Sequence, residues 1–222
     1  MTDYSTTRDR VETYFDRTAT TVWERLTSDA PVSRIRQTVR AGRDRMRALM
    51  LSRLPADLRG CRVLDAGCGA GQMTAELAAR GADVLAVDIS PALVEIAARR
   101  LPEADRARVT FASGDMLSAA HGGFDFVLAM DSLIYYTTPD IVAALETLGA
   151  RSRAAVVFTV APRTPFLMTF FTLGKAFPRA DRSPVMIPQA HVALTRATHG
   201  RVAKIDRVTS GFYISECLEY RP

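Results

Sequence analysis

The sequence predicts an α/β fold with a doubly wound, mostly parallel sheet, and three observations lead to this prediction. Short apolar runs alternate with helix-forming segments from residue 61 onwards. A dense glycine turn at residues 67–71 directly follows the first of these runs. Acidic residues stand at the ends of the next runs, where the strands of open α/β sheets meet their ligands.

The first strand, turn and helix form the most informative unit. Cys61 to Asp65 is a short apolar run typical of a buried strand, and Gln72 to Arg80 has helix-forming composition and stops at Gly81. Between them, glycines at positions 67, 69 and 71 allow a tight turn and a close approach to a ligand. Free N–H groups of the first helical turn point outward at this place, so we expect a ligand site there.

The later elements continue the alternation and end in a strand pair. Ser90 can cap a helix whose first residue is Pro91, and the run Phe124–Met130 is almost continuously apolar, as in a central strand. We predict strands at Asp83–Asp88, Val109–Ala112, Phe124–Met130 and Ala154–Val160, helices at Pro91–Arg100 and Pro139–Gly149, and a final pair, Val202–Val208 and Phe212–Tyr220, joined through Gly211.

Two segments lie outside this scheme, and we expect them to close over the site as a lid. Residues 1–55 form a helical N-terminal arm, and residues 56–222 form the ligand-binding domain with a lid insertion at about 161–190. The arm carries many arginines, which could equally form a solvated helix face: Arg34, Arg36, Arg40, Arg43, Arg45, Arg47 and Arg53. The insertion carries apolar residues that could instead pack as an ordinary core helix: Phe166, Leu167, Met168, Phe170, Phe171, Leu173 and Phe177.

Composition indicates a globular protein of a reducing compartment. The chain of 222 residues is 48% hydrophobic, and no apolar run approaches the roughly 18 residues needed to span a bilayer. Its three cysteines lack metal-type spacing and its start lacks an apolar signal region, so we expect a cytoplasmic protein. The net charge of +5 favours an acidic partner but does not choose between nucleic acid, an anionic membrane and a carboxylate substrate.

The glycine turn distinguishes two cofactor classes. A dinucleotide-binding enzyme would have a glycine at the sixth position of the fingerprint, where this chain has Gln72. The form Asp-x-Gly-x-Gly-x-Gly instead resembles the first motif of class I S-adenosylmethionine-dependent methyltransferases. That resemblance implies a seven-stranded, Rossmann-like sheet, which the five strands and the terminal pair would supply.

This resemblance implies that the end of each strand contacts a different part of S-adenosylmethionine. Asp88 can accept hydrogen bonds from both ribose hydroxyls, because a carboxylate takes two donors. Each of the acidic residues could instead only cap a helix, but four strand ends in register favour a shared ligand. The expected contacts are Asp65, Gly67, Cys68 and Gly69 with the amino-acid end, Asp88 and Ile89 with the ribose, Asp115 and Met116 with the adenine, and Met130, beside Asp131, with the transferring methyl.

Flanking motifs narrow the resemblance to the magnesium-protoporphyrin IX O-methyltransferases. The N-terminal block and the Leu-Ile-x-Tyr segment are its most specific parts, and the similarity runs nearly end to end. The matching stretches are Tyr14-Phe15-Asp16, Trp23-Glu24-Arg25, Ser33 to Arg43 with Arg40 and Gly42 retained, Asp131 to Tyr136, Ala161-Pro162, Phe177-Pro178 and Phe212 to Ser215.

This resemblance implies methylation of a propionate of magnesium-protoporphyrin IX, giving the monomethyl ester in chlorophyll and bacteriochlorophyll biosynthesis. A carboxylate is already ionised at neutral pH, so the reaction needs in-line positioning and exclusion of water rather than a general base. Tyr135 stands where the oxygenic members have a histidine, and with Tyr14 it is our candidate catalytic residue, donating a hydrogen bond that orients the substrate. Arg40 can hold the cofactor carboxylate in a bidentate pair, or instead the other propionate of the porphyrin, and we favour the cofactor because Arg40 matches a position that the family retains.

The same resemblance sets the expected partners. Magnesium would arrive inside the porphyrin, and His121, His191 and His199 have no ligand-like spacing, so we expect no metal site of the enzyme. The porphyrin-binding subunit of magnesium chelatase is a candidate partner, the photosynthetic membrane a candidate site of peripheral association, and no nucleic-acid partner is expected. The alternatives are a methyltransferase of a quinone or another organic acid, a nicotinamide-dependent oxidoreductase, and a nucleic-acid methyltransferase.

Overall fold

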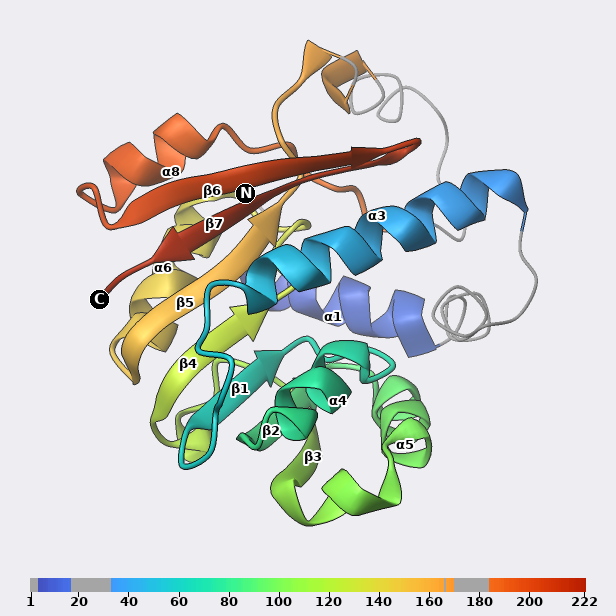
Figure 1. Ribbon diagram of the computed structural model, residues 1–222. Helices are drawn as coiled ribbons and strands as arrows, with labels where there is room; N and C mark the ends of the chain where they lie inside the picture. Colours follow the sequence, from blue (N-terminus) through green and yellow to red (C-terminus); the bar gives the residue numbers. More distant parts are fainter. Residues whose placement is uncertain (1–3, 17–32, 166, 170–183) are drawn as a thin grey trace.

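The computed structural model describes residues 4–16, 33–165, 167–169 and 184–222 and contains one sheet with helices on both faces (Figure 1). The strand order in this seven-stranded sheet is β3-β2-β1-β4-β5-β7-β6. In this sheet β7 runs antiparallel to both of its neighbours, β5 and β6, and the other neighbouring strands pair in parallel. The predicted fold class is therefore confirmed.

The strands lie close to the predicted positions, and the apolar runs of the central strands β1, β4 and β5 are largely buried between two helix layers. Leu64, Val127 and Val157, in three neighbouring strands, have no exposed surface. The observed bounds are β1 Arg62–Ala66, β2 Asp83–Asp88, β3 Val109–Ser113, β4 Phe124–Ala129, β5 Ser152–Val160, β6 Val202–Ser210 and β7 Tyr213–Tyr220.

Two helices of the sheet domain begin at side-chain caps, of which the sequence predicted Ser90. The Ser90 hydroxyl accepts a hydrogen bond from the Leu93 N–H ahead of α5, and Thr137 forms a capping box with Asp140 ahead of α6. The bounds are α4 Gln72–Ala79, α5 Pro91–Arg100 and α6 Thr138–Gly149. Helix α8, His191–Ala197, was not predicted, because it is short, has no side-chain cap and buries only Leu194 among its residues.

Two helices precede the sheet and lie on different parts of it. Helix α1, Tyr4–Tyr14, lies beside the carboxyl ends of the parallel strands, whereas α3, Arg34–Leu51, runs along the β6–β7 hairpin (Figure 1). Gly42 allows this close packing, since a Cβ there would lie 2.7 Å from Cδ1 of Tyr213. The second half of α3 buries one face, on which Met46, Met50 and Leu51 have no exposed surface, whereas residues 33–38 at its start are exposed.

The predicted insertion after β5 is tied down at its two ends. The Gln189 N–H donates to the Ala161 carbonyl, and the Ile187 N–H donates to the Ile134 carbonyl, both at 2.8 Å. Leu167 and Met168 are half-buried. The remaining aromatic residues expected in this lid, and Trp23 of the N-terminal block, lie outside the described residues. Among the helices that the structure describes, none is long and apolar enough to cross a membrane.

Candidate active site

The glycine turn after β1 leaves open space on one side. Gly67 and Gly71 have φ of +85° and +82°, and a Cβ there would lie 2.5 Å from Cβ of Ser132 and 2.8 Å from Cβ of Ala97. Gly69 has φ of +52°, yet nothing lies within 4 Å of the position its Cβ would take. The turn is therefore pressed against its neighbours at both ends and faces a cavity at its middle, as a ligand-binding turn requires.

Two buried carboxyl groups lie beneath this turn. Asp88 Oδ2 accepts a hydrogen bond from the Gly69 N–H at 2.8 Å, and Oδ1 accepts one from the Ser90 N–H at 3.0 Å. Asp65 accepts a hydrogen bond from the Thr74 hydroxyl at 2.6 Å. Burial raises the pKa of Asp88, and burial raises the pKa of Asp65 to about 7. A cation placed beside either group would favour its ionised form.

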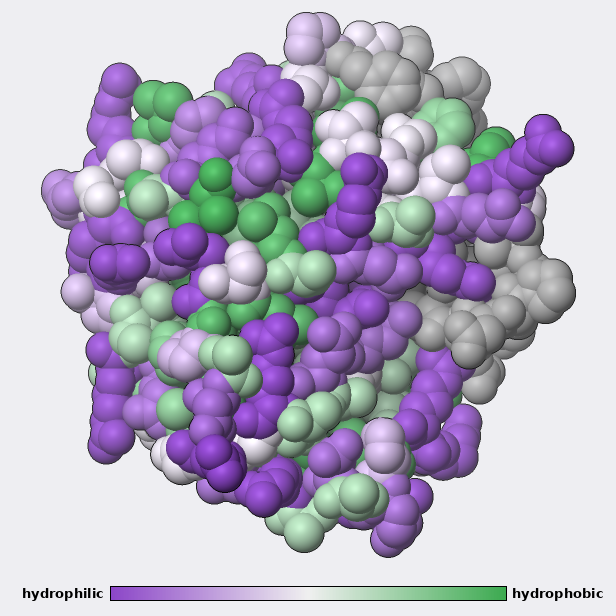
Figure 2. All heavy atoms as spheres, viewed as in Figure 1, coloured by the Kyte–Doolittle hydropathy of each residue, from purple (hydrophilic) through white to green (hydrophobic). Residues whose placement is uncertain are grey.

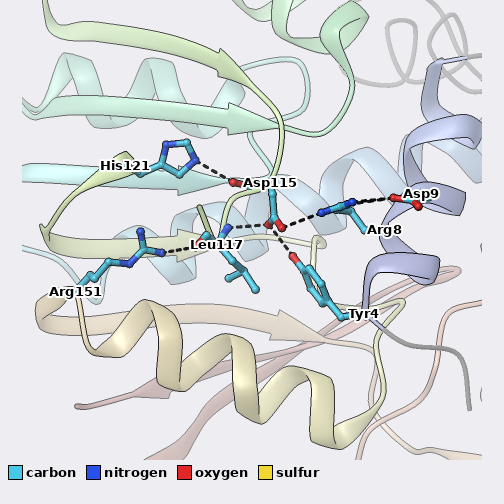
Figure 3. Close-up of polar contacts among 7 residues, drawn as sticks. All are labelled: Tyr4, Arg8, Asp9, Asp115, Leu117, His121 and Arg151. Atoms are coloured by element: carbon cyan, nitrogen blue, oxygen red, sulfur yellow. Dashed lines mark hydrogen bonds and ion pairs between the residues drawn. The ribbon is translucent and has the colours of Figure 1, made fainter. Parts of the chain in front are cut away.

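Asp115, after β3, ties the N-terminal helix to the sheet (Figure 3). Its Oδ1 accepts from the Tyr4 hydroxyl and from the Leu117 N–H, both at 2.9 Å, and its Oδ2 pairs with Arg8 at 3.2 Å. The ring of Tyr4 also stacks on Tyr136, with 4.9 Å between centroids. These contacts place α1 as a wall over the ends of the central strands.

The turn, the strand ends and α1 enclose one pocket of about 1040 Å³, part of which is open to solvent. The pocket brings together these residues predicted from the sequence: Asp65, Gly67, Cys68, Gly69, Asp88, Ile89, Asp115, Met116, Met130 and Tyr135. The contact of each with a ligand stays a prediction.

Arg40 and Tyr14 are not part of this pocket lining. Arg40 lies half-buried on α3, while Arg43 and Arg47, one and two turns further along the same helix, line the cavity. Tyr14 packs edge-on against Phe15, with 5.3 Å between ring centroids. Tyr14 lies near enough to Tyr135 to add to the raised pKa of that phenol, after burial and the charge of Asp131.

Tyr135 is a hydrogen-bond donor at neutral pH. Its side chain is 8% exposed and packs edge-on against Phe15, with 6.4 Å between centroids. Burial raises the pKa of Tyr135, and the nearby charge of Asp131 raises it further. The phenol therefore keeps its proton and cannot serve as a base near pH 7.

Comparison with known proteins places the chain in a family. The family described as "Magnesium-protoporphyrin IX methyltransferase C-terminus" matches residues 129–222, and a general methyltransferase domain matches residues 63–152. The magnesium-protoporphyrin O-methyltransferase of Rhodobacter capsulatus is 64% identical over 99% of both chains. The chain belongs to the magnesium-protoporphyrin O-methyltransferase family. The sequence-based identification of this family is thereby confirmed.

More distant members of the magnesium-protoporphyrin O-methyltransferases agree over the whole length. The enzyme of that name from Synechocystis is 29% identical over 94% of both chains. The crystal structure of magnesium protoporphyrin IX methyltransferase from Synechocystis PCC 6803 with bound SAH has a TM-score of 0.80 and 26% sequence identity, covering 97% of this chain and 100% of that one. Family and fold are therefore supported independently by sequence and by structure.

Sequence reasoning missed part of this methyltransferase pocket, although a signal was present. Tyr4, Arg8, Val11 and Phe15 all line it and follow the spacing i, i+4, i+7 and i+11, which is one face of a helix. That stripe mixes aromatic, basic and apolar residues, so its hydrophobic pattern is weak. Arg43 and Arg47 were recognised as basic residues of the arm but not as pocket residues.

Proposed function

We propose that the chain transfers a methyl group from S-adenosylmethionine to a propionate carboxylate of magnesium-protoporphyrin IX, forming the monomethyl ester. The observation that carries this proposal is the 64% identity, over 99% of both chains, to a magnesium-protoporphyrin O-methyltransferase. The reaction belongs to the biosynthesis of chlorophyll and bacteriochlorophyll. A Synechocystis relative was crystallised with SAH, which agrees with the cofactor predicted from the glycine turn.

The pocket fits this cofactor on three points. The space in front of Gly69 is open, as a ligand over the turn requires. The Ser132 hydroxyl oxygen at the pocket wall is buried and has no hydrogen-bond partner among the described residues. Such a buried orphan group is costly unless a ligand satisfies it. The Asp88 carboxylate keeps acceptor capacity beside its two backbone donors, as a ribose site would need.

The chemistry requires positioning more than proton transfer. When bound, S-adenosylmethionine supplies a sulfonium methyl that a carboxylate oxygen attacks while the carbon–sulfur bond electrons leave to sulfur. Because the substrate carboxylate is already ionised, no protein group has to remove a proton. Tyr135 donates its phenolic hydrogen bond and orients the nucleophile, with Tyr14 contributing from the end of α1. Helix α1 covers one side of the pocket and shields that side from water.

The alternative is an S-adenosylmethionine-dependent methyltransferase of another small molecule, a quinone or an organic acid. A hydroxyl substrate with a pKa near 10 would need a base, and the pKa of Tyr135 is raised rather than lowered. The family match over residues 129–222 also favours the porphyrin.

One experiment tests the proposed function directly. Purified protein is titrated with magnesium-protoporphyrin while its visible absorbance is recorded, and S-adenosylmethionine is then added for mass analysis of the porphyrin. We expect saturable binding and a product heavier by one methyl group. Methylation of a quinol but not of the porphyrin would support the alternative.

We further propose peripheral association with the photosynthetic membrane, and transfer of the porphyrin from the porphyrin-binding subunit of magnesium chelatase. Support comes from the N-terminal end of α3, where Arg34 and Arg36 are exposed and Ile35 is 57% exposed. Phe212 is equally exposed on the adjacent hairpin turn. Hydrophilic residues cover most of this face of the molecule, with smaller hydrophobic patches between them (Figure 2). Co-sedimentation with anionic but not neutral vesicles, weakened in Phe212→Ser, is the expected result.

A further inference from the structure

We infer that Arg43, held in place by Asp131, binds the propionate carboxylate that accepts the methyl group. This inference rests on the proposed function and adds the residue that recognises the reacting group. Arg43 lines the pocket together with Asp131, Met130 and Tyr135, and its side chain is 16% exposed. It is therefore a largely buried cation at the end of β4, where the methyl group is expected.

Four segments of the chain meet at the Asp131 carboxylate. Arg43 of α3 pairs with its Oδ2 through Nη1, and the Tyr213 hydroxyl of β7 donates to Oδ1 at 3.2 Å. The Thr159 hydroxyl of β5 donates to Oδ1 at 3.1 Å and accepts from the Asp131 N–H at 2.7 Å. Burial keeps the Tyr213 phenol neutral by raising its pKa. Arg43, Tyr213 and Thr159 thus fix the orientation of the Asp131 carboxylate. Asp131 in turn orients the Arg43 side chain.

The backbone at this position is strained, as at many functional sites. Asp131 has φ of +56°, a left-handed conformation that few residues other than glycine adopt. The surrounding hydrogen bonds over-determine the strained residue and so retain it. Gly42 adds to this arrangement, because its contact with Tyr213 brings α3 close enough for the next residue, Arg43, to reach Asp131. The strained backbone of Asp131 and the close packing of Gly42 on Tyr213 therefore both occur at the ion pair of Arg43 and Asp131.

The other pocket arginines are placed for other tasks. Arg8 pairs with Asp115, beyond the end of β3, on the side expected to hold adenine. Arg47 pairs with Glu76 of α4 at 2.5 Å, beside the helix that follows the glycine turn. Arg43 alone among these three has its partner directly after β4.

Electrostatics favour a substrate carboxylate at this ion pair. An arginine without a counter-charge would repel the sulfonium, whereas the pair of Arg43 and Asp131 is neutral. A guanidinium offers five N–H donors in one plane and can serve Asp131 and a second carboxylate together. With both ligands present, the positive charges of Arg43 and the sulfonium balance the negative charges of Asp131 and the propionate in a pocket of low dielectric. Arg43 would orient the propionate oxygen without deprotonating anything.

The test compares magnesium-protoporphyrin with its dimethyl ester, which lacks both carboxylates, by absorbance titration of the full chain. We expect the wild-type protein to prefer the diacid, and Arg43→Met to lose about 10- to 100-fold of that preference, the range of charge-assisted hydrogen bonds. Affinity for S-adenosylmethionine, measured by calorimetry, should change less than threefold. Arg45→Met is the matched control, because Arg45 is exposed and bonds only to a backbone carbonyl, that of Thr209, among the contacts described.

A second variant guards against unfolding caused by an unpaired buried Asp131. Arg43→Met combined with Asp131→Asn removes both charges and should show the same loss of preference. Arg43→Lys keeps the charge without the planar fork and should recover part of it. An unchanged preference in the folded variants would overturn the inference, and so would a loss of S-adenosylmethionine affinity alone, which would make Arg43 a cofactor residue. Failure of the wild-type protein to bind either porphyrin would instead refute the proposed function.

Discussion

At the scale of single residues, the buried Asp65 carboxyl makes the site sensitive to pH. Its pKa is raised by burial to about 7, so the free protein carries it partly protonated at neutral pH. If the ammonium group of S-adenosylmethionine binds beside it, as predicted, only the ionised form binds well. Cofactor affinity should then rise about tenfold from pH 5.5 to 7, a window in which the ligand keeps its positive charge. Calorimetry at several pH values measures this, and Asp65→Asn should flatten the profile.

The Asp65 carboxyl also affects the stability of the fold, which should fall with rising pH where the cofactor affinity rises. The pKa of Asp65 in the folded protein lies above its usual value of 3.8, so its contribution to stability is fully present below about pH 4 and is lost as the pH rises through 7. Between pH 5 and 8, the Tm of the ligand-free wild-type protein should therefore fall by more than the Tm of the Asp65→Asn variant. Asp83→Asn, at the exposed start of β2, is the control and should follow the wild type. Equal pH dependence of the wild type and Asp65→Asn would contradict the assignment.

Tyr135 provides a residue-scale prediction about the reaction itself. Because its raised pKa keeps the phenol protonated, Tyr135→Phe removes a hydrogen-bond donor and not a base. We expect kcat to fall about 10- to 100-fold, at about 1.4 kcal/mol per tenfold, while some turnover remains. With both substrates saturating, kcat should stay flat between about pH 6 and 9, since the substrate carboxylate is ionised throughout. A steep rise over that range, absent from the Phe variant, would show that Tyr135 acts as a base.

At the scale of elements, α1 is held over the pocket by a small number of polar contacts. Tyr4 and Arg8 both bind the Asp115 carboxylate, and Val11 is buried in the core (Figure 3). In the double variant Tyr4→Phe with Arg8→Gln, α1 should exchange its amide hydrogens at least tenfold faster, as expected for an element with fewer stabilising contacts. Cofactor affinity should fall with it, because α1 forms one wall of the site.

The matched control for α1 is Asp9→Asn. Asp9 pairs with Arg8 at 3.0 Å but is exposed and lies away from Asp115. Exposed ion pairs contribute little, so exchange in α1 should remain as in the wild type. If the double variant exchanges no faster than this control, α1 is held by its apolar face alone.

At the scale of the whole molecule, cofactor binding should stabilise the entire fold, since the pocket is built from α1, α3 and the strand ends together. S-adenosylmethionine at about 100 times its Kd adds about 2.7 kcal/mol, which corresponds to a rise in Tm of roughly 5–10 °C for a chain of this size. Asp88→Asn at the same ligand concentration should lose most of this rise, because one charged hydrogen-bond acceptor is removed. Thermal melting with and without ligand measures it, and an undiminished rise would remove Asp88 from the site.

The arrangement of the sheet could be predicted because its signals are local. The apolar runs, the glycine turn, the cap at Ser90 and the proline at position 139 act over a few residues, so each predicted strand and helix of the sheet lies near its expected position. Strand ends in a parallel sheet meet at one edge, so Asp65, Asp88 and Asp115 could be assigned to one site before any coordinates were known. Helix α8 escaped prediction because its seven residues carry too little pattern.

The N-terminal residues of the site depended on tertiary structure. Sequence alone determined that the arginines lie on one helix before the sheet, and it selected Arg40 as the residue that would reach the ligand. In the structure Arg43 and Arg47 line the pocket and Arg40 does not, and the contact of Arg40 with the cofactor stays a prediction. Which turn of α3 reaches the site is set by where that helix contacts the hairpin, and Gly42 and Tyr213 make that contact from positions 171 residues apart. Local sequence patterns carry no information on contacts between residues so far apart in the sequence. Only the folded chain could therefore decide which turn of α3 reaches the pocket.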